Sequence, residues 1–311
     1  IKDLWFGKGI LWLCCVPMTC WSNTMVCEFN EQQDLAYNVR RAIPEHLEIF
    51  QQWRHDADRY RSERLDALID LEYGPDPRHR LDLFPAIGQK AGESSPLAIV
   101  FHGGYWQALD KADNRHVCRS LCDAGWTIAL LNYRLCPAVN IGDICDDVEA
   151  ATHWLVHKQQ EWSLDCTDIA VIGHSAGAHL AAMLACRFTD PLRALGARIG
   201  SLALVSGVFE LECLIGTRMN ERLSLNPSTA NRWSPSRYDP PRAIRVDSTV
   251  GERETHGFFD QQLCLADAWR SKVDWSAGSI PDADHLHIWS QLADPASPMA
   301  QRLVAHLGSK T

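Results

Sequence analysis

The segment with the clearest chemical potential is Gly173-His174-Ser175-Ala176-Gly177, which matches the pattern G-x-S-x-G. The apolar run Ile169–Gly173 precedes the serine, and the alanine-rich stretch Ala176–Phe188 follows it. A strand that turns sharply into a helix exposes a serine hydroxyl, and residues beside the serine must be small to avoid clashes. We therefore predict that Ser175 is a nucleophile. The alternative is a glycine-rich turn with a solvent-facing serine.

A second glycine-rich segment, His102-Gly103-Gly104-Tyr105-Trp106, follows the apolar run 97–101. Adjacent glycines let backbone N–H groups approach a developing oxyanion without a Cβ in the way. We predict that the N–H groups of Gly103, Gly104 and Ala176 form an oxyanion hole, whereas a simple tight turn is the alternative. Tyr105 and Trp106 are expected to border the substrate pocket, with core packing of Trp106 as the alternative.

The general base and the acid should follow the serine in the chain, in the order Ser, acid, His. Four histidines come late enough, namely His256, His285, His287 and His306. We favour His285, because it follows a loop that contains Gly and Pro and precedes a helical tail. The candidate acids are Asp247, Glu252, Glu254 and Asp260, all within or just after an apolar run that ends at Gly251. Of these, Glu254 is preferred.

The elements that must position these residues are short strands alternating with helices. Apolar runs predict strands over residues 81–84, 97–101, 127–133, 169–173, 202–205 and 244–250. Between them, Ile144, Val148, Ala151 and Leu155 recur at helical spacing. Continuously apolar strands must be covered on both faces. The sequence therefore predicts an α/β fold with a mostly parallel sheet and helices on each side.

The chain divides into a leader at 1–30, an N-terminal helical cap at 31–70 and a catalytic domain at 71–311. We interpret the leader as a variable segment, with a docked cap and a targeting signal as alternatives. Apolar residues at helical spacing predict one or two surface helices within residues 44–70. Residues 207–242 contain Asn-Pro, Ser-Pro and Pro-Pro pairs, and we expect a lid excursion over the sheet there.

Composition excludes several classes of function. Lys and Arg number 30 against 39 Asp and Glu, so the net charge of −9 disfavours binding to nucleic acid or anionic lipid. The longest apolar run, residues 10–18, is too short to span a membrane. The 12 cysteines include no C-x-x-C pair, which argues against a zinc ribbon and favours a reduced, cytoplasmic protein.

Further motifs accompany the two glycine-rich segments. They are Leu71-Glu72-Tyr73-Gly74 followed by Leu81-Asp82-Leu83-Phe84, and Asp284-His285 followed by Leu292-Ala293-Asp294-Pro295. Together with HGGYW and GHSAGAHLAA, they resemble the kynurenine formamidase (arylformamidase) group of α/β-hydrolases, a branch of the HGG-containing esterase and lipase relatives. The likeness extends from about Tyr37 to about residue 307.

The resemblance also bears on the acid. In that family the acid lies in a segment G-x-x-(D/E)-(S/T)-x-x-F-x-x-Q, which is matched here by Gly251, Glu254, Thr255, Phe258 and Gln261. This match supports Glu254 over Glu252. The chain departs from the family at Leu286, where Phe is usual after the catalytic His, and at Gly257, where Glu is usual before the Phe.

The resemblance implies an α/β-hydrolase fold and a Ser175-His285-Glu254 triad that hydrolyses a formyl amide on an aromatic amine. Related members act as carboxylesterases, so a general short-chain carboxylesterase is the alternative. A catalytically silent binding protein on the same fold is the rival from another class. No metal or other cofactor is expected. The expected partner is a small-molecule ester or aryl formamide substrate. A homodimer is the assembly that we consider for this chain.

Overall fold

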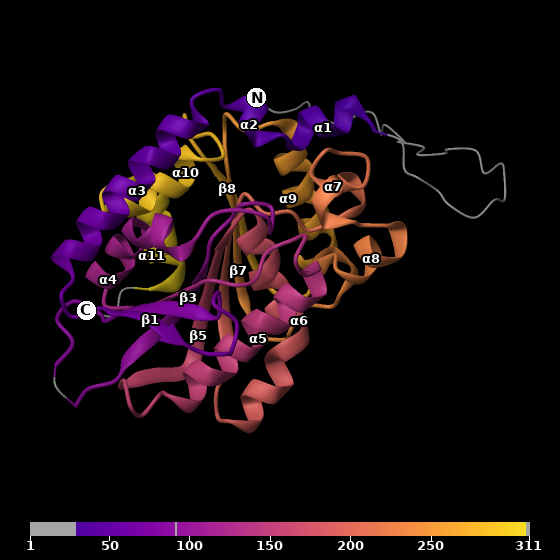
Figure 1. Cartoon of the computed structure of the whole chain (residues 1–311). Coiled ribbons are helices and arrows are strands. Elements are labelled where there is room, and N and C mark those ends of the chain that lie inside the picture. Colours follow the sequence, from indigo (N-terminus) through magenta and orange to yellow (C-terminus); the bar gives the residue numbers. More distant parts are fainter. Residues whose placement is uncertain (1–28, 91, 309–311) are drawn as a thin grey trace, which may run out of the picture.

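The centre of the molecule is an eight-stranded sheet (Figure 1). The computed structural model describes residues 29–90 and 92–308, so most of the leader, residues 1–28, lies outside the described residues. The strands are β1 (Leu68–Glu72), β2 (Arg80–Phe84), β3 (Ser95–Phe101), β4 (Thr127–Leu131), β5 (Leu164–His174), β6 (Ile199–Val205), β7 (Arg245–Gly251) and β8 (Asp274–Ile280). Their order is β1-β2-β4-β3-β5-β6-β7-β8, and only the pairs that involve β2 are antiparallel.

Parallel pairing brings the chemically interesting loops to one edge of the sheet. At the carboxyl ends of the strands, Phe101 of β3 pairs with Gly173 of β5, and His174 pairs with Val205 of β6. The glycine-rich loop after β3, which is predicted to form the oxyanion hole, and the turn at Ser175 after β5 are therefore neighbours. Ligand sites in open α/β sheets form at this edge.

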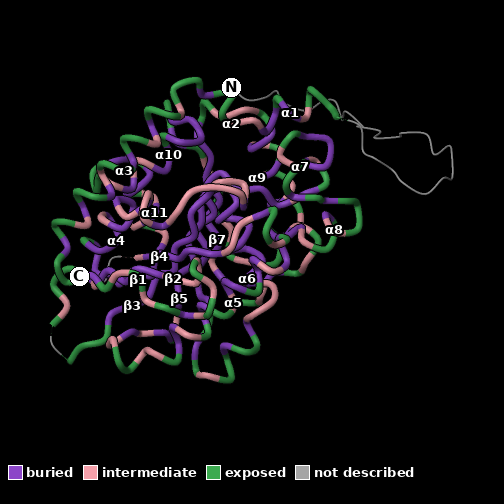
Figure 2. The backbone as a smooth tube through the Cα atoms, viewed as in Figure 1, coloured by how far each residue is buried: buried purple, intermediate pink, exposed green. Residues whose placement is uncertain are grey.

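Helices cover both faces of the sheet, and each face has its own apolar core. One face carries α3 (His46–Glu63), η1 (Lys111–Cys118), α4 (Arg119–Asp123), α10 (His287–Ser290), η4 (Gln291–Ala293) and α11 (Pro298–Leu307). The other face carries α5 (Ile141–His157), α6 (Ala176–Ala194) and α9 (His256–Trp269). Figure 2 shows the buried strands at the centre and exposed residues on the outer helices. This arrangement confirms the predicted α/β class.

Two strands and one helix boundary differ from the sequence prediction. Strands β1 and β8 are the outer strands of the sheet and carry polar residues, so they lack the continuous apolar run that marked the inner strands. Helix α3 ends at Glu63, and the expected helical residues Leu65 and Leu68 lie instead in a turn and in β1. Leu65 is 87% exposed, so its apolar side chain does not belong to a buried helix face.

The N-terminal helices α1 (Glu31–Tyr37) and α2 (Val39–Ala42) lie at the carboxyl edge of the sheet, and α3 continues from there along one face (Figure 1). The hydroxyl of Tyr105 donates to the Tyr37 carbonyl at 2.5 Å, and that of Thr255 donates to the Ala36 carbonyl at 2.5 Å. These bonds join α1 both to the loop after β3 and to the start of α9.

Residues 207–242 form an irregular excursion beside α1, which we call the lid segment. It contains η2 (Glu212–Leu214), α7 (Asn220–Leu223), α8 (Pro227–Arg232) and η3 (Pro235–Arg237). The carboxylate of Asp34 in α1 accepts the backbone N–H of Arg218 at 2.9 Å, which joins the segment to the N-terminal helices. Within the described part of the chain, no helix has the length and apolarity needed to cross a membrane.

Candidate active site

Ser175 occupies a strained turn between β5 and α6. Its φ is +56° and its ψ is −119°, a conformation that L-residues rarely adopt. Its N–H donates to the Val205 carbonyl at 2.8 Å, and helix α6 starts at the next residue. A backbone held in this way turns the serine side chain away from the sheet.

The glycines on either side of Ser175 are required by close packing. A Cβ on Gly173 would lie 2.1 Å from the carbonyl oxygen of Gly177, and one on Gly177 would lie 2.2 Å from that of Phe101. Neither contact is compatible with any other residue. The G-x-S-x-G spacing therefore has a local steric cause at this turn.

His285 and Glu254 form a direct pair next to Ser175. The Nδ1 atom of His285 lies 2.7 Å from Oε2 of Glu254, and both side chains are buried. The other carboxylate oxygen, Oε1, accepts the hydroxyl of Ser206 and, at 2.7 Å, the backbone N–H of Gly251. The carboxylate is thus fixed by three donors when His285 Nδ1 carries its proton. That tautomer leaves the Nε2 lone pair of His285 free to accept a proton.

The residues matched to the family's acid segment surround this pair. The Phe258 ring packs on the His285 ring with centroids 4.1 Å apart. The Gln261 side chain is buried and accepts the Phe209 N–H at 2.6 Å. Gly257, where the family usually has Glu, faces α1, because a Cβ there would lie 2.7 Å from the Ala36 carbonyl oxygen.

The other candidate acids face elsewhere. Glu252 is exposed and accepts the Ser279 hydroxyl at 3.0 Å. Asp247 is buried in β7 and pairs with Arg302, and Asp260 is exposed.

The other candidate bases are also directed away from Glu254. His287 pairs with Asp284 at 2.7 Å, and His306 contacts the Leu202 carbonyl at 3.0 Å. His256 is exposed at the start of α9.

The predicted oxyanion donors lie around Ser175. A Cβ on Gly103 would meet the Ser175 Cβ at 3.1 Å, so this glycine allows the loop to approach the serine closely. Gly104 has φ +107° and lines the same cavity as Ser175. Ala176 is the first residue of α6, where N–H groups have no intrahelical acceptor. Within the described chain, no hydrogen bond engages the N–H of Gly104 or Ala176.

Tyr105 and Trp106 have different surroundings. Tyr105 lines the cavity. Trp106 is fully buried and does not line it, and its ring packs edge-on against His179 with centroids 4.9 Å apart. The expectation that Trp106 borders the substrate is therefore wrong. Both residues have positive φ, and the resulting turn places the indole in the core beneath the loop.

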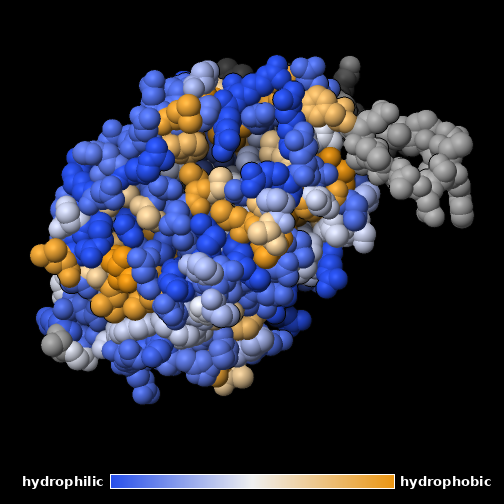
Figure 3. Space-filling view, in the orientation of Figure 1, coloured by the Kyte–Doolittle hydropathy of each residue, from blue (hydrophilic) through white to orange (hydrophobic). Residues whose placement is uncertain are grey.

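Four of the predicted site residues, Gly104, Tyr105, Ser175 and His285, line a cavity of about 320 Å³. Ser175 and His285 both line it, although no hydrogen bond joins their side chains among the described residues. Catalytic hydrogen bonds are often formed only once a substrate is bound. The apolar part of the cavity wall includes residues that were not predicted from the sequence to belong to the site. They are Val39, Phe50 and Trp53 from the N-terminal helices and Met219 from the lid segment. Figure 3 shows hydrophilic surface around the region between α2 and α7.

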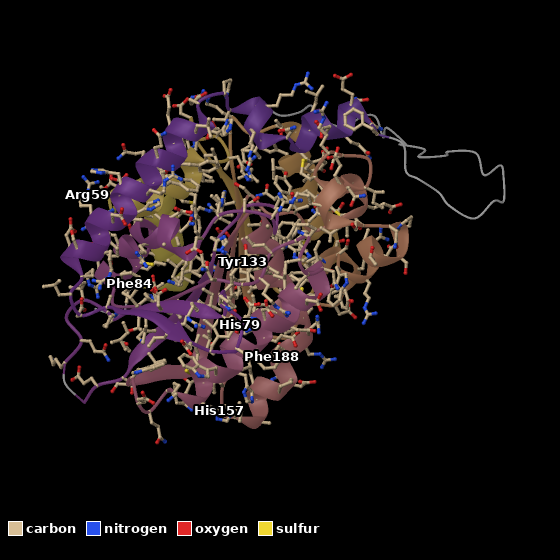
Figure 4. All side chains as sticks on the ribbon, viewed as in Figure 1. Arg59, His79, Phe84, Tyr133, His157 and Phe188 are labelled. Atoms are coloured by element: carbon tan, nitrogen blue, oxygen red, sulfur yellow. The ribbon has the colours of Figure 1, made fainter. Side chains whose placement is uncertain are left out.

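Two buried histidines, His102 and His174, have structural contacts beside the site. His102 stacks on Tyr133 with centroids 4.5 Å apart, near the middle of the molecule (Figure 4), and contacts the Gly103 carbonyl at 2.7 Å. Burial lowers the pKa of His102 to about 4. The Nε2 atom of His174 lies 2.8 Å from the His285 carbonyl oxygen, and burial holds the pKa of His174 well below its usual range. Both rings are therefore neutral supports of the loops beside Ser175.

Comparisons with known proteins point in one direction. Residues 81–200 match the BD-FAE family model. The chain is 29% identical over 249 residues to the kynurenine formamidase of Danio rerio, covering 78% of this chain and 82% of that protein. It is 29% identical over 261 residues to esterase LipQ of Mycobacterium tuberculosis, covering 76% and 59% respectively. The crystal structure of a candidate thioesterase from Silicibacter sp. TM1040 superimposes with a TM-score of 0.75 at 30% identity, covering 87% of this chain and 98% of that one.

An eight-stranded, mostly parallel sheet covered on both faces, with a serine in the sharp turn after β5, defines an α/β-hydrolase. The relatives narrow this class. The chain is an α/β-hydrolase and an enzyme of the hydrolase class, and it is similar to kynurenine formamidases and, more widely, to esterases. The resemblance inferred from the motifs is thereby confirmed.

Proposed function

We propose that this enzyme is a serine hydrolase that removes small acyl groups, with aryl formamides of the N-formylkynurenine type as its main substrates. The observation that carries the proposal is the buried contact of 2.7 Å between Glu254 and His285, a histidine that lines the same cavity as Ser175. The kynurenine formamidase relatives support the choice of acyl group and leaving group. A cytoplasmic location and a homodimeric assembly remain predictions.

The proposed reaction has two steps. Ser175 Oγ attacks the formyl carbon while His285 Nε2 takes the proton of the serine hydroxyl. The developing oxyanion accepts hydrogen bonds from the N–H groups of Gly103, Gly104 and Ala176. His285 then gives the proton to the leaving nitrogen, so the aromatic amine departs and a formyl-serine remains. Water then attacks the formyl carbon while His285 takes a proton from it, and His285 returns the proton to Ser175 Oγ as the bond from Oγ to the formyl carbon breaks and formic acid leaves. Glu254 keeps the imidazole oriented and stabilises its charged form.

A general short-chain carboxylesterase is the second candidate. It uses the same steps with an alkoxide or phenoxide leaving group, and the similarity to esterase LipQ favours it. The two candidates differ in the size of acyl group and in the kind of bond they accept. A formamidase should prefer very small acyl groups and draw its binding energy from the aromatic leaving group.

Steady-state kinetics can separate the two candidates. We expect kcat/KM to fall from acetyl to octanoyl p-nitrophenyl esters, and we expect N-formylkynurenine to release formate. Ser175→Ala is the control, since its kcat should fall by up to about a million-fold on both substrate classes. Optimal rates on hexanoyl or octanoyl esters without formate release would overturn the formamidase proposal and leave the carboxylesterase standing.

A further inference from the structure

The catalytic cavity carries a charge pattern opposite to that of the whole chain. The chain has a net charge of −9, yet the cavity is lined by Arg40, Arg218 and Arg222 and by no Asp or Glu. All three arginines are exposed, whereas Ser175 and His285 are buried. The cations therefore surround the outer part of the cavity, and the reacting groups lie at its inner end.

Two of these arginines are held on one turn of the lid segment. Arg218 lies just before α7 and Arg222 lies within it, and both residues line the cavity. The Arg218 guanidinium lies over the Phe29 ring at 5.5 Å, and Arg222 Nη2 donates to the Cys136 carbonyl at 3.3 Å. These contacts orient the guanidinium groups and leave most of their donors unused.

No carboxylate neutralises these cations among the described residues. Arg40, Arg218 and Arg222 form no ion pair there, whereas Arg41, next to Arg40, pairs with Glu31 at 3.7 Å. Glu221 adjoins Arg222 in sequence but forms no ion pair in the described chain and does not line the cavity. The cavity thus presents guanidinium groups whose fork-shaped donors match a carboxylate.

We propose that the outer part of the cavity is an anion subsite in which Arg218 and Arg222 bind a carboxylate on the leaving group of the substrate. This inference rests on the proposed function, because that function assigns Ser175 to the acyl group. A small acyl group at Ser175 leaves the rest of the substrate to extend outward, toward the two arginines. The proposal therefore specifies an anionic leaving group, for a formamide and an ester alike.

Matched acetyl esters test the charge preference without depending on formamide hydrolysis. The substrates are phenyl acetate, 3-acetoxybenzoate and 3-(trimethylammonio)phenyl acetate, with rates corrected for the pKa of each leaving phenol. We expect kcat/KM to be about three- to tenfold higher for the anion than for the neutral ester at low salt, and lowest for the cation. Because exposed charges are screened, the preference should shrink in 0.5 M NaCl, where the Debye length is about 4–5 Å.

The arginine variants locate the subsite. Arg218→Gln and Arg222→Gln should each lower the anion-to-neutral ratio of kcat/KM, mainly through KM, and Arg222→Glu should invert it. The matched control is Arg232→Gln, which makes the same change of net charge in the lid segment but lies outside the cavity. The proposal would be overturned if the anion-to-neutral ratio of kcat/KM were the same in the wild type and in the two Gln variants. It would also be overturned if Arg232→Gln lowered this ratio as much as Arg218→Gln and Arg222→Gln do.

A binding measurement separates failure of the subsite from failure of the proposed chemistry. In the Ser175→Ala variant, calorimetric titration compares 3-acetamidobenzoate with the neutral 3-acetamidobenzamide. Tighter binding of the carboxylate that weakens on Arg222→Gln supports the subsite even if no ester is turned over. Equal affinities of the two ligands would overturn the subsite, whatever the enzyme hydrolyses.

Discussion

The carboxylate of Glu254 shows how single residues determine what this site can do. One oxygen meets His285, and the other is held by the Ser206 hydroxyl and the Gly251 N–H. Ser206 follows β6 directly and has φ +51°, so the residue that holds Glu254 has a strained backbone, as Ser175 itself has. Such fixed surroundings keep the imidazole in one orientation and one tautomer.

This arrangement predicts unequal effects at two neighbouring glutamates. Glu254→Gln should lower kcat on p-nitrophenyl acetate by about 10²–10⁴-fold, because the imidazolium formed in the reaction loses its counter-charge. Glu252→Gln is the matched control and should change kcat little, since the Glu252 side chain is exposed and accepts the Ser279 hydroxyl rather than a bond from His285. Stopped-assay kinetics with circular dichroism would check both variants. A larger loss at Glu252 would move the acid to that residue.

At the scale of elements, the inner strands were predictable and the outer ones were not. Inner parallel strands such as β3, β4 and β6 contain apolar runs, because helices cover both of their faces. Strands β1 and β8 have neighbours on one side only and lack that signal.

The same contrast applies to the site. Ser175 and the neighbouring glycines have a local spacing that the turn requires. The residues of the cavity wall have no such spacing in the sequence, since Trp53 and Met219 reach the site through tertiary packing. A buried aromatic such as Trp106 looks the same in sequence whether it faces substrate or core.

The contact between α1 and α9 gives a prediction for these elements. Gly257→Ala would place a methyl group 2.7 Å from the Ala36 carbonyl and 2.9 Å from the Tyr37 ring. We expect a loss of about 1–3 kcal/mol in the free energy of unfolding, together with a higher KM, because residues just after α1 line the cavity. Urea titration and ester kinetics measure both effects. Leu263→Ala, on the exposed side of α9, is the control, and an unchanged KM in Gly257→Ala would contradict the coupling.

At the scale of the whole molecule, buried histidines should govern stability in mild acid. Burial lowers the pKa values of His102, His116 and His179 to about 4, and that of His174 lies well below its usual range. In the unfolded chain these groups titrate near pH 6.5. Between about pH 6.5 and 4 the unfolded chain therefore binds more protons, so stability falls as the pH falls through this window.

Urea unfolding between pH 7.5 and 5 measures this linkage. We expect unfolding to take up about three or four protons in this window. The free energy of unfolding should therefore fall with decreasing pH by about 1.4 kcal/mol per pH unit for each of these protons. His116→Phe should reduce the slope by about one proton. Neither ring nitrogen of His116 has a hydrogen-bond partner among the residues that the structure describes, so the substitution keeps an aromatic ring and removes the titration. A flat free energy from pH 6.5 to 5 would refute the linkage.

Part of the cavity wall comes from stretches of the chain that are separate from the proposed catalytic residues. Helices α1 to α3 precede the sheet and the lid segment interrupts it, whereas Ser175, Glu254 and His285 follow strands of the sheet itself. Mutations that accumulate in the two wall segments during evolution can therefore alter substrate choice while the catalytic geometry stays intact. For protein engineering, the same separation makes residues 29–63 and 207–242 natural units for exchange between homologous enzymes.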